Sequence, residues 1–145
     1  MRVARFSNEL VLVFARGERF IETLTRYLER ERITAARFTG IGAFSQAQIK
    51  YFDVERKQYE QREVDAQVEV ISLIGNVALR EGKPFIHAHV CLGDREYRAL
   101  AGHLGEGTVS PTLELFLTRI KGELTRRHDD VSGLDALHAH PEAEA

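Results

Sequence analysis

Residues Pro84–Gly93 read PFIHAHVCLG. Apolar residues and histidines alternate along it with a period of two, and this is the period of a β-strand. The pattern predicts a strand with one face in the core and His87 and His89 on the opposite face. The core face comprises Ile86, Ala88, Val90 and Leu92, and the opposite face also carries Phe85 and Cys91.

A second strand is predicted at Tyr97–Leu104, after a short turn. A three-residue loop, Asp94–Glu96, would pair Gly93 with Tyr97 and place His103 directly opposite His87. Directly opposed side chains lie only about 5 Å apart at Cβ, so three imidazoles should converge on one patch. The same register predicts three apolar pairs, namely Val90 with Leu100, Ala88 with Gly102 and Ile86 with Leu104.

Three neutral imidazoles at this separation are a ligand set for zinc and similar divalent metals. We therefore predict a divalent metal site, with zinc as the expected ion, at His87, His89 and His103. Three protein ligands leave one coordination position open to water or to a small molecule. The alternative is that these are core histidines satisfied by ordinary hydrogen bonds.

Glu114 is the candidate catalytic residue, because it alternates away from Leu113, Leu115 and Leu117 in a strand predicted at Thr112–Thr118. It could ligate the metal, orient a histidine or act as a general base. The alternative is an exposed carboxylate or an interface ion pair.

Other polar residues carry weaker signals. Asn76 is a minor site candidate, and Cys91 shares the histidine face but is expected to be a packed thiol. A second His-x-His, at His138 and His140, lies in no predicted strand and has no third partner, so adventitious metal binding or contact with solvent is expected. His128 is likewise expected at the surface.

The remaining pattern is one helix and a series of strands. A helix is predicted at Glu18–Arg32, with Phe20, Ile21, Leu24, Tyr27 and Leu28 at helical spacing. One helix among many strands predicts an α+β domain on a mostly antiparallel sheet. We expect a single domain at residues 1–128 and a short, flexible tail at 129–145. Further strands are predicted at Glu9–Ala15, Ala35–Thr39, Gln46–Phe52, Tyr59–Glu63 and Val68–Leu79.

The composition is that of an ordinary globular protein. Of the 145 residues, 43% are hydrophobic and 29% are charged, and the formal net charge is −2. Twenty basic and twenty-two acidic residues are interspersed, so no polyanion-binding stripe is predicted. The N-terminus lacks the apolar core of a signal peptide, and Cys91 has no partner for a disulfide; we expect a cytoplasmic protein with no membrane segment.

Four stretches in this order resemble one family: FTGIGAFSQAQIKYFD (Phe38–Asp53), EVISLIGNV (Glu69–Val77), GKPFIHAHVCLGD (Gly82–Asp94) and AGHLGEGTVSPTLELFL (Ala101–Leu117). Together they resemble the PPC (plant and prokaryote conserved) domain. The resemblance implies an antiparallel sheet with a packed helix, a homotrimer, and a metal site at histidines that match His87, His89 and His103. The family is labelled DNA-binding by association with plant AT-hook proteins, but no AT-hook occurs here, and direct nucleic-acid binding is not expected of this net acidic chain.

Three functions are compatible with these observations. The first is a regulatory homotrimer that the metal stabilises. The second is a metal-dependent enzyme, because the three-histidine arrangement is similar to that of acetolactate decarboxylases; this implies a lyase acting on a small oxo- or hydroxy-acid. The third is DNA binding, as the family label suggests.

Overall fold

The computed structural model describes residues 1–141 and has one helix and nine strands in that range. The strands are β1 (Arg2–Phe6), β2 (Glu9–Ala15), β3 (Ala36–Asp53), β4 (Gln58–Val64), β5 (Val68–Arg80), β6 (Lys83–Gly93), β7 (Ala99–Arg119), β8 (Glu123–Asp129) and β9 (Leu134–His140). They join in one sheet in the order β1-β2-β7-β3-β5-β8-β9, with β4 paired to β3, and β6 paired to both β5 and β7. All strand pairs are antiparallel except a single parallel pairing of β5 with β8. The predicted α+β class, with a mostly antiparallel sheet and one packed helix, is confirmed.

The bounds of β2 and β6 agree closely with the predictions. β1 was not predicted, because its sequence RVARF has little apolar alternation.

β3 and β7 are each one long strand, although the sequence predicts two shorter strands in each place. β3 pairs with β5 through its first half and with β4 through its second half, while β7 accompanies it along most of its length. The pairing shifts register near Gly40 and Gly42, so the strand bends without ending. A side chain on Gly42 would collide with the backbone of β7 at Thr112 and Leu113, which explains why the bend needs glycine.

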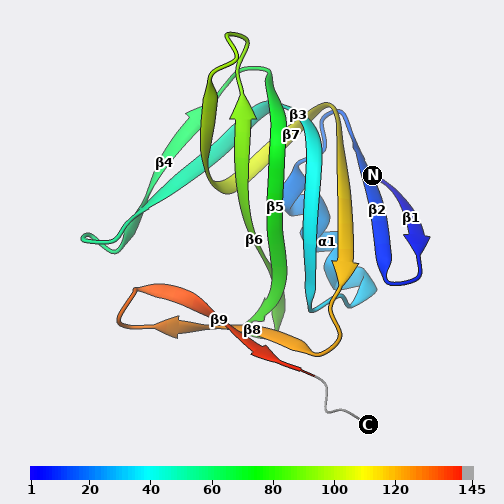
Figure 1. The fold of residues 1–145 in the computed structure, drawn as a ribbon, viewed down its shortest axis with the longest axis vertical. Helices are drawn as coiled ribbons and strands as arrows, with labels where there is room; N and C mark the ends of the chain where they lie inside the picture. Colours follow the sequence, from blue (N-terminus) through cyan, green and yellow to red (C-terminus); the bar gives the residue numbers. More distant parts are fainter. Residues whose placement is uncertain (142–145) are drawn as a thin grey trace.

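Helix α1 (Phe20–Glu31) packs on one side of the sheet, behind β7 and β3 in Figure 1. Phe20, Leu24, Tyr27 and Leu28 are buried, as the helical spacing predicts, and Ile21 is partly buried. The helix is two residues shorter at its start than predicted. A distant carboxylate caps it: Glu106 of β7 accepts hydrogen bonds from the backbone N–H groups of Ile21 (2.8 Å) and Glu22 (3.2 Å).

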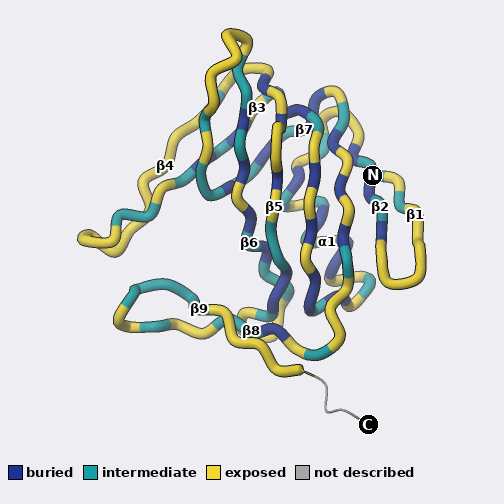
Figure 2. Tube along the Cα trace, viewed as in Figure 1, coloured by how far each residue is buried: buried dark blue, intermediate teal, exposed yellow. Residues whose placement is uncertain are grey.

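The core lies between the helix and the inner face of the sheet, and buried residues alternate with exposed ones along the strands in Figure 2. β6 follows this pattern on its core face. Ile86, Ala88, Val90 and Leu92 are buried, as predicted. The histidines of β6 therefore point to the outer face.

The C-terminal segment differs from the prediction. A flexible tail is expected from residue 129, but β8 and β9 form a regular hairpin that crosses below the main sheet (Figure 1). Leu124 anchors it by burying its side chain against Ala35 and Ala78. Residues 142–145 of the predicted tail lie outside the described residues, and the division of the chain at residue 128 stays a prediction.

In the described part of the chain, no helix has the length and apolar character needed to cross a bilayer.

Candidate metal centre

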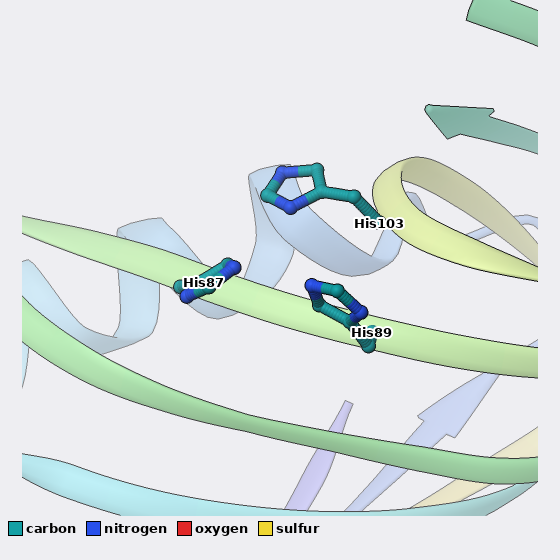
Figure 3. A group of neighbouring side chains, drawn as sticks. All are labelled: His87, His89 and His103. Carbon is teal, nitrogen blue, oxygen red and sulfur yellow. The ribbon is translucent and has the colours of Figure 1, made fainter. Parts of the chain in front are cut away.

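The three predicted histidines meet at one place. His87 and His89 project from β6 and His103 from β7, with the rings gathered above the strands in Figure 3. The ring centroids are 5.2 Å apart for His87 and His89, 5.0 Å for His87 and His103, and 5.5 Å for His89 and His103. One nitrogen from each ring can be chosen so that all three lie within 4.8 Å of one another.

The predicted strand register is wrong by two residues. His103 pairs with His89, not with His87, and Gly93 pairs with Ala99. The connecting loop has five residues instead of three, because the Asp94 carboxylate accepts hydrogen bonds from the backbone N–H groups of Glu96 and Arg98 and so closes a wider turn.

The three histidines converge despite the register error, because a shift of two residues keeps every side chain on its own face of the sheet. The predicted apolar pairs are wrong for the same reason: Val90 pairs with Gly102, and Leu92 pairs with Leu100.

A cavity of about 760 Å³ opens over the histidines. It lies between the second half of β3, with β4, and the β8–β9 hairpin, and this volume is in the usual range for small-molecule sites. Tyr59 of β4 packs beside His103 at a centroid distance of 5.2 Å, and Phe85 forms another part of the wall. The site can therefore admit a small molecule next to the imidazoles.

Arg126 of β8 contacts His87 from the opposite side of the cavity. Its Nη2 lies 2.9 Å from Oδ1 of Asn76 and 3.0 Å from Nδ1 of His87, and its Nη1 donates to the backbone carbonyl of Asp135 at 3.0 Å. A guanidinium group can only donate, so Nδ1 of His87 must accept and the ring is neutral with its proton on Nε2. Asn76 sits opposite His87 in the β5–β6 pairing, which explains how it joins this network.

The site keeps two of the imidazoles neutral. Burial lowers the pKa of His87 to about 4, with a further contribution from the positive charge of Arg126. Burial also lowers the pKa of His103 to about 4, with smaller contributions from His87 and His89. Neutral imidazole is the form that binds a metal, so these two rings can serve as ligands without first losing a proton at neutral pH.

The residues fit a divalent metal. Nitrogens around one tetrahedral ion are about 3.3 Å apart for metal–nitrogen distances of about 2.0–2.1 Å, so small rotations of the three side chains would suffice. His89 is exposed, whereas His87 and His103 are partly buried, which leaves an open side toward the cavity. An ion held there would act as a Lewis acid toward an oxygen-bearing ligand.

The other predicted residues lie apart from this cluster. Glu114 is exposed on a different part of β7, where it pairs with Val13 of β2 and Ile41 of β3, and it does not line the cavity. Cys91 is a partly buried free thiol on β6, consistent with a packed residue. His128 is exposed, as predicted.

The second His-x-His pair is in a strand after all. His138 and His140 lie in β9, contrary to the prediction that this segment has no strand, and both are exposed. They take no part in the three-histidine group, as expected from their lack of a third partner.

Arg126 and Tyr59 were not predicted as site residues. Arg126 lies in a segment without apolar periodicity, and only its place two residues after buried Leu124 could have indicated an inward-facing position. Tyr59 alternates with charged neighbours in QYEQREV, which reads as an exposed strand.

This fold and site define a small antiparallel β-sheet protein with a three-histidine cluster. The sequence model of the plants and prokaryotes conserved (PCC) domain matches residues 1–121. The chain belongs to this family, which confirms the resemblance. A comparison with curated proteins finds no match.

Several solved structures are similar over nearly their full length. A plant- and prokaryote-conserved protein from Pyrococcus horikoshii is 34% identical, with a TM-score of 0.84 over 99% of this chain and 96% of that one. A metal-containing protein from Archaeoglobus fulgidus is 33% identical, with a TM-score of 0.84 over 93% and 94%. A candidate DNA-binding protein from Ralstonia eutropha JMP134 is 29% identical, with a TM-score of 0.88 over 94% of each chain.

A more distant likeness concerns the fold alone. The α-acetolactate decarboxylase of Bacillus subtilis strain 168 is 11% identical, with a TM-score of 0.56 over 90% of this chain and 61% of that one.

Proposed function

We propose that this chain is a homotrimeric protein that binds one divalent metal, zinc, per subunit through His87, His89 and His103, and that the metal stabilises the fold or the assembly in a regulatory role. The observation that carries this proposal is the convergence of three imidazoles whose ligand nitrogens lie within 4.8 Å of one another. The metal-containing relative from Archaeoglobus fulgidus supports it. Zinc is the preferred ion because an all-imidazole set suits a borderline-soft metal better than calcium or magnesium.

An exposed apolar face supports the assembly part of the proposal. Phe116, Thr39, Ile74 and His89 are successive partners across β7, β3, β5 and β6, so they form one row on the outer face of the sheet. Phe116 and Ile74 are 49% and 54% exposed, and Ile41 nearby is 55% exposed. A monomer rarely leaves such a row in water, and neighbouring subunits would cover it together with the histidine edge.

Elemental analysis of protein purified without a histidine tag tests the metal part. We expect about one zinc per chain in the wild type, near zero in His103→Ala, and an unchanged content in the control His128→Ala. Metal-free wild-type protein that does not take up zinc on titration would refute the site.

The assembly part is tested by the mass of the particle in solution. Light scattering should give three times the chain mass of 16.5 kDa. Removing the metal with a chelator should lower the melting temperature or dissociate the particle, because a ligand that binds only the folded state stabilises it. A metal-free trimer with unchanged melting would contradict a structural role for the metal.

A cytoplasmic location goes with this proposal. The chain holds one cysteine, Cys91, so its fold does not depend on an intrachain disulfide, and this is compatible with a reducing compartment.

The second candidate is a metal-dependent enzyme, specifically a lyase of the acetolactate decarboxylase type acting on a small oxo- or hydroxy-acid. The cavity over the histidines favours it, since a metal with an open position there would meet such a substrate directly. Glu114 stays the predicted proton-transfer residue of this alternative, and it would have to act from outside the cavity of its own subunit. A screen of such acids with metal-loaded protein tests the idea; equal rates for the wild type and His87→Ala/His89→Ala would eliminate it.

DNA binding finds less support in the chain itself. The net charge of −2 and the dispersed basic residues are unfavourable for phosphate neutralisation. A gel-shift series across salt concentrations tests it, and a shift that weakens steeply with ionic strength would restore DNA binding as a function.

A further inference from the structure

The cavity over the histidines carries an excess of positive charge. Its charged lining, apart from the histidines, consists of Lys50, Arg80, Arg126 and Asp135. Asp135 is the one carboxylate among these lining residues, and it already pairs with Arg80 at 3.2 Å. Lys50 and Arg126 are therefore left as two cations beside three imidazoles.

These two cations flank the histidine cluster on different sides. Lys50 is the cross-strand neighbour of His103 in the β3–β7 pairing, and Arg126 lies 3.0 Å from His87. Among the ion pairs formed by residues 1–141, none includes Lys50 or Arg126, although the Asp135 carboxylate attracts Arg126 from a longer distance. Arg126 donates hydrogen bonds only to neutral acceptors, and its Nε is buried without a hydrogen-bond partner. The one carboxylate of the lining is therefore shared between Arg80 and Arg126, and the positive charge that remains favours an anion from solution.

Metal binding would change what Arg126 can do. If the metal takes Nδ1 of His87, it occupies the lone pair that Arg126 now uses. If it takes Nε2, the ring proton must move to Nδ1, which then becomes a donor and can no longer accept from Arg126. The hydrogen bond between Arg126 and His87 is therefore lost in either case. With a metal bound, the guanidinium group of Arg126 would be free to donate this hydrogen bond to another acceptor.

We propose that the cavity, with the proposed metal in place, binds a small oxyanion, a carboxylate or a phosphate, whose charged oxygens pair with Arg126. A planar guanidinium group suits the paired oxygens of a carboxylate or a phosphate. Lys50 adds charge from the side of His103. The aromatic walls, Tyr59 and Phe85, provide contact for a short carbon skeleton. This inference rests on the proposed metal site and names the ligand class that the site accepts.

Calorimetric titration of zinc-loaded protein tests the inference with three probes. L-Lactate and inorganic phosphate carry the oxyanion, and lactamide is the neutral counterpart of lactate. We expect lactate or phosphate to bind at least tenfold more tightly than lactamide, and to lose this preference when the zinc is removed. The comparison of lactate with phosphate decides which of the two oxyanions the site prefers.

Substitutions in β8 test whether Arg126 causes the preference for oxyanions. Arg126→Met should weaken oxyanion binding by about 10- to 100-fold with the zinc content retained, because hydrogen bonds to charged groups are the strong ones. Arg127→Met is the matched control, since Arg127 is exposed on the same strand, and it should bind as the wild type does. If Arg126→Met does not fold, Arg126→Lys replaces it: this variant keeps the charge but loses the paired donors, and it should bind several-fold more weakly than the wild type.

The outcomes separate the two proposals. Wild-type protein that holds no zinc by elemental analysis refutes the metal site, and this inference with it. Zinc-loaded protein that binds lactate and phosphate no better than lactamide, or equally well without Arg126, refutes the oxyanion site and leaves the metal site intact.

Discussion

Two hairpins of this protein carry the same His-x-His motif, and only one of them gathers a third imidazole. In the β6–β7 hairpin, His87 and His89 meet His103 from the partner strand in a cavity. In the β8–β9 hairpin, His138 and His140 stay exposed, and their neighbours on β8, Thr125 and Glu123, offer no third imidazole. Period-two spacing places two rings on one face, but the partner strand decides whether a third imidazole joins them.

The largest expected difference between the two hairpins is in metal affinity. His89→Ala should weaken zinc binding by more than the 10- to 100-fold that loss of a supporting residue typically causes, because it removes a ligand itself. His138→Ala/His140→Ala should stay within about twofold of the wild type. Competition titration against a zinc chelator measures both. If the two variants lose affinity equally, the distinction between the hairpins is wrong.

The next largest effect is expected from a substitution that disturbs the packing next to the β6–β7 hairpin. Gly75 of β5 lies against β6, and a methyl group there would collide with the carbonyl oxygen of His87 and the ring of Phe38. Gly75→Ala should therefore lower the free energy of unfolding by about 1–3 kcal/mol. Gly105→Ala is the control, since its nearest neighbours are the flexible ends of the Gln48 and Lys50 side chains. Urea unfolding of metal-free protein measures both, and equal stability of the two variants would contradict the packing described.

Acid should destabilise the metal-free protein by protonating His87 and His103 of the β6–β7 hairpin. The pKa values of His87 and His103 are lowered from 6.5 to about 4 in the folded state, so the unfolded chain binds more protons between these values. The contribution of these two neutral imidazoles to the free energy of unfolding is fully present above pH 6.5, and it is lost as the pH falls toward 4. His87→Gln/His103→Gln should have a flatter dependence of urea midpoint on pH between 7 and 5. A slope equal to that of the wild type would mean that neither imidazole is held neutral.

The smallest expected effect concerns the second hairpin. Arg80 pairs with Asp135 at 3.2 Å and lies over the ring of Phe85 at 4.0 Å, so it ties the hairpin to the end of β5. Arg80→Met should cost at most about 1 kcal/mol of stability, since both contacts are partly exposed. Hydrogen exchange should nevertheless quicken in β8 and β9 and stay unchanged in β6. Faster exchange in β6 as well would show that the two hairpins do not open independently.

Local patterns predicted most of the fold. The bounds of β2 and β6 agree with the sequence prediction, and the buried face of α1 follows its helical spacing. Both depend on side-chain periodicity, which is a property of each element alone. β3 and β7 were divided because glycine-rich stretches read as breaks, whereas here they bend strands that continue.

The convergence of the three histidines was predicted for a sound reason, and only the strand register was wrong. Face alternation brings the three histidines together, and it tolerates the register error of two because the period is also two. The loop length could not be derived, since it depends on the hydrogen bonds that Asp94 makes within the turn. Arg126 could not be found either, because its approach to His87 depends on how a separate hairpin crosses the sheet.

The whole proposal depends on three imidazoles holding one metal. Anomalous diffraction at the zinc absorption edge, from crystals of untagged protein grown with zinc, would locate that metal. We expect one strong peak per chain, within about 2.0–2.1 Å of a nitrogen from each of His87, His89 and His103. A peak at His138 and His140 alone, or no peak among the three rings, would refute the metal site.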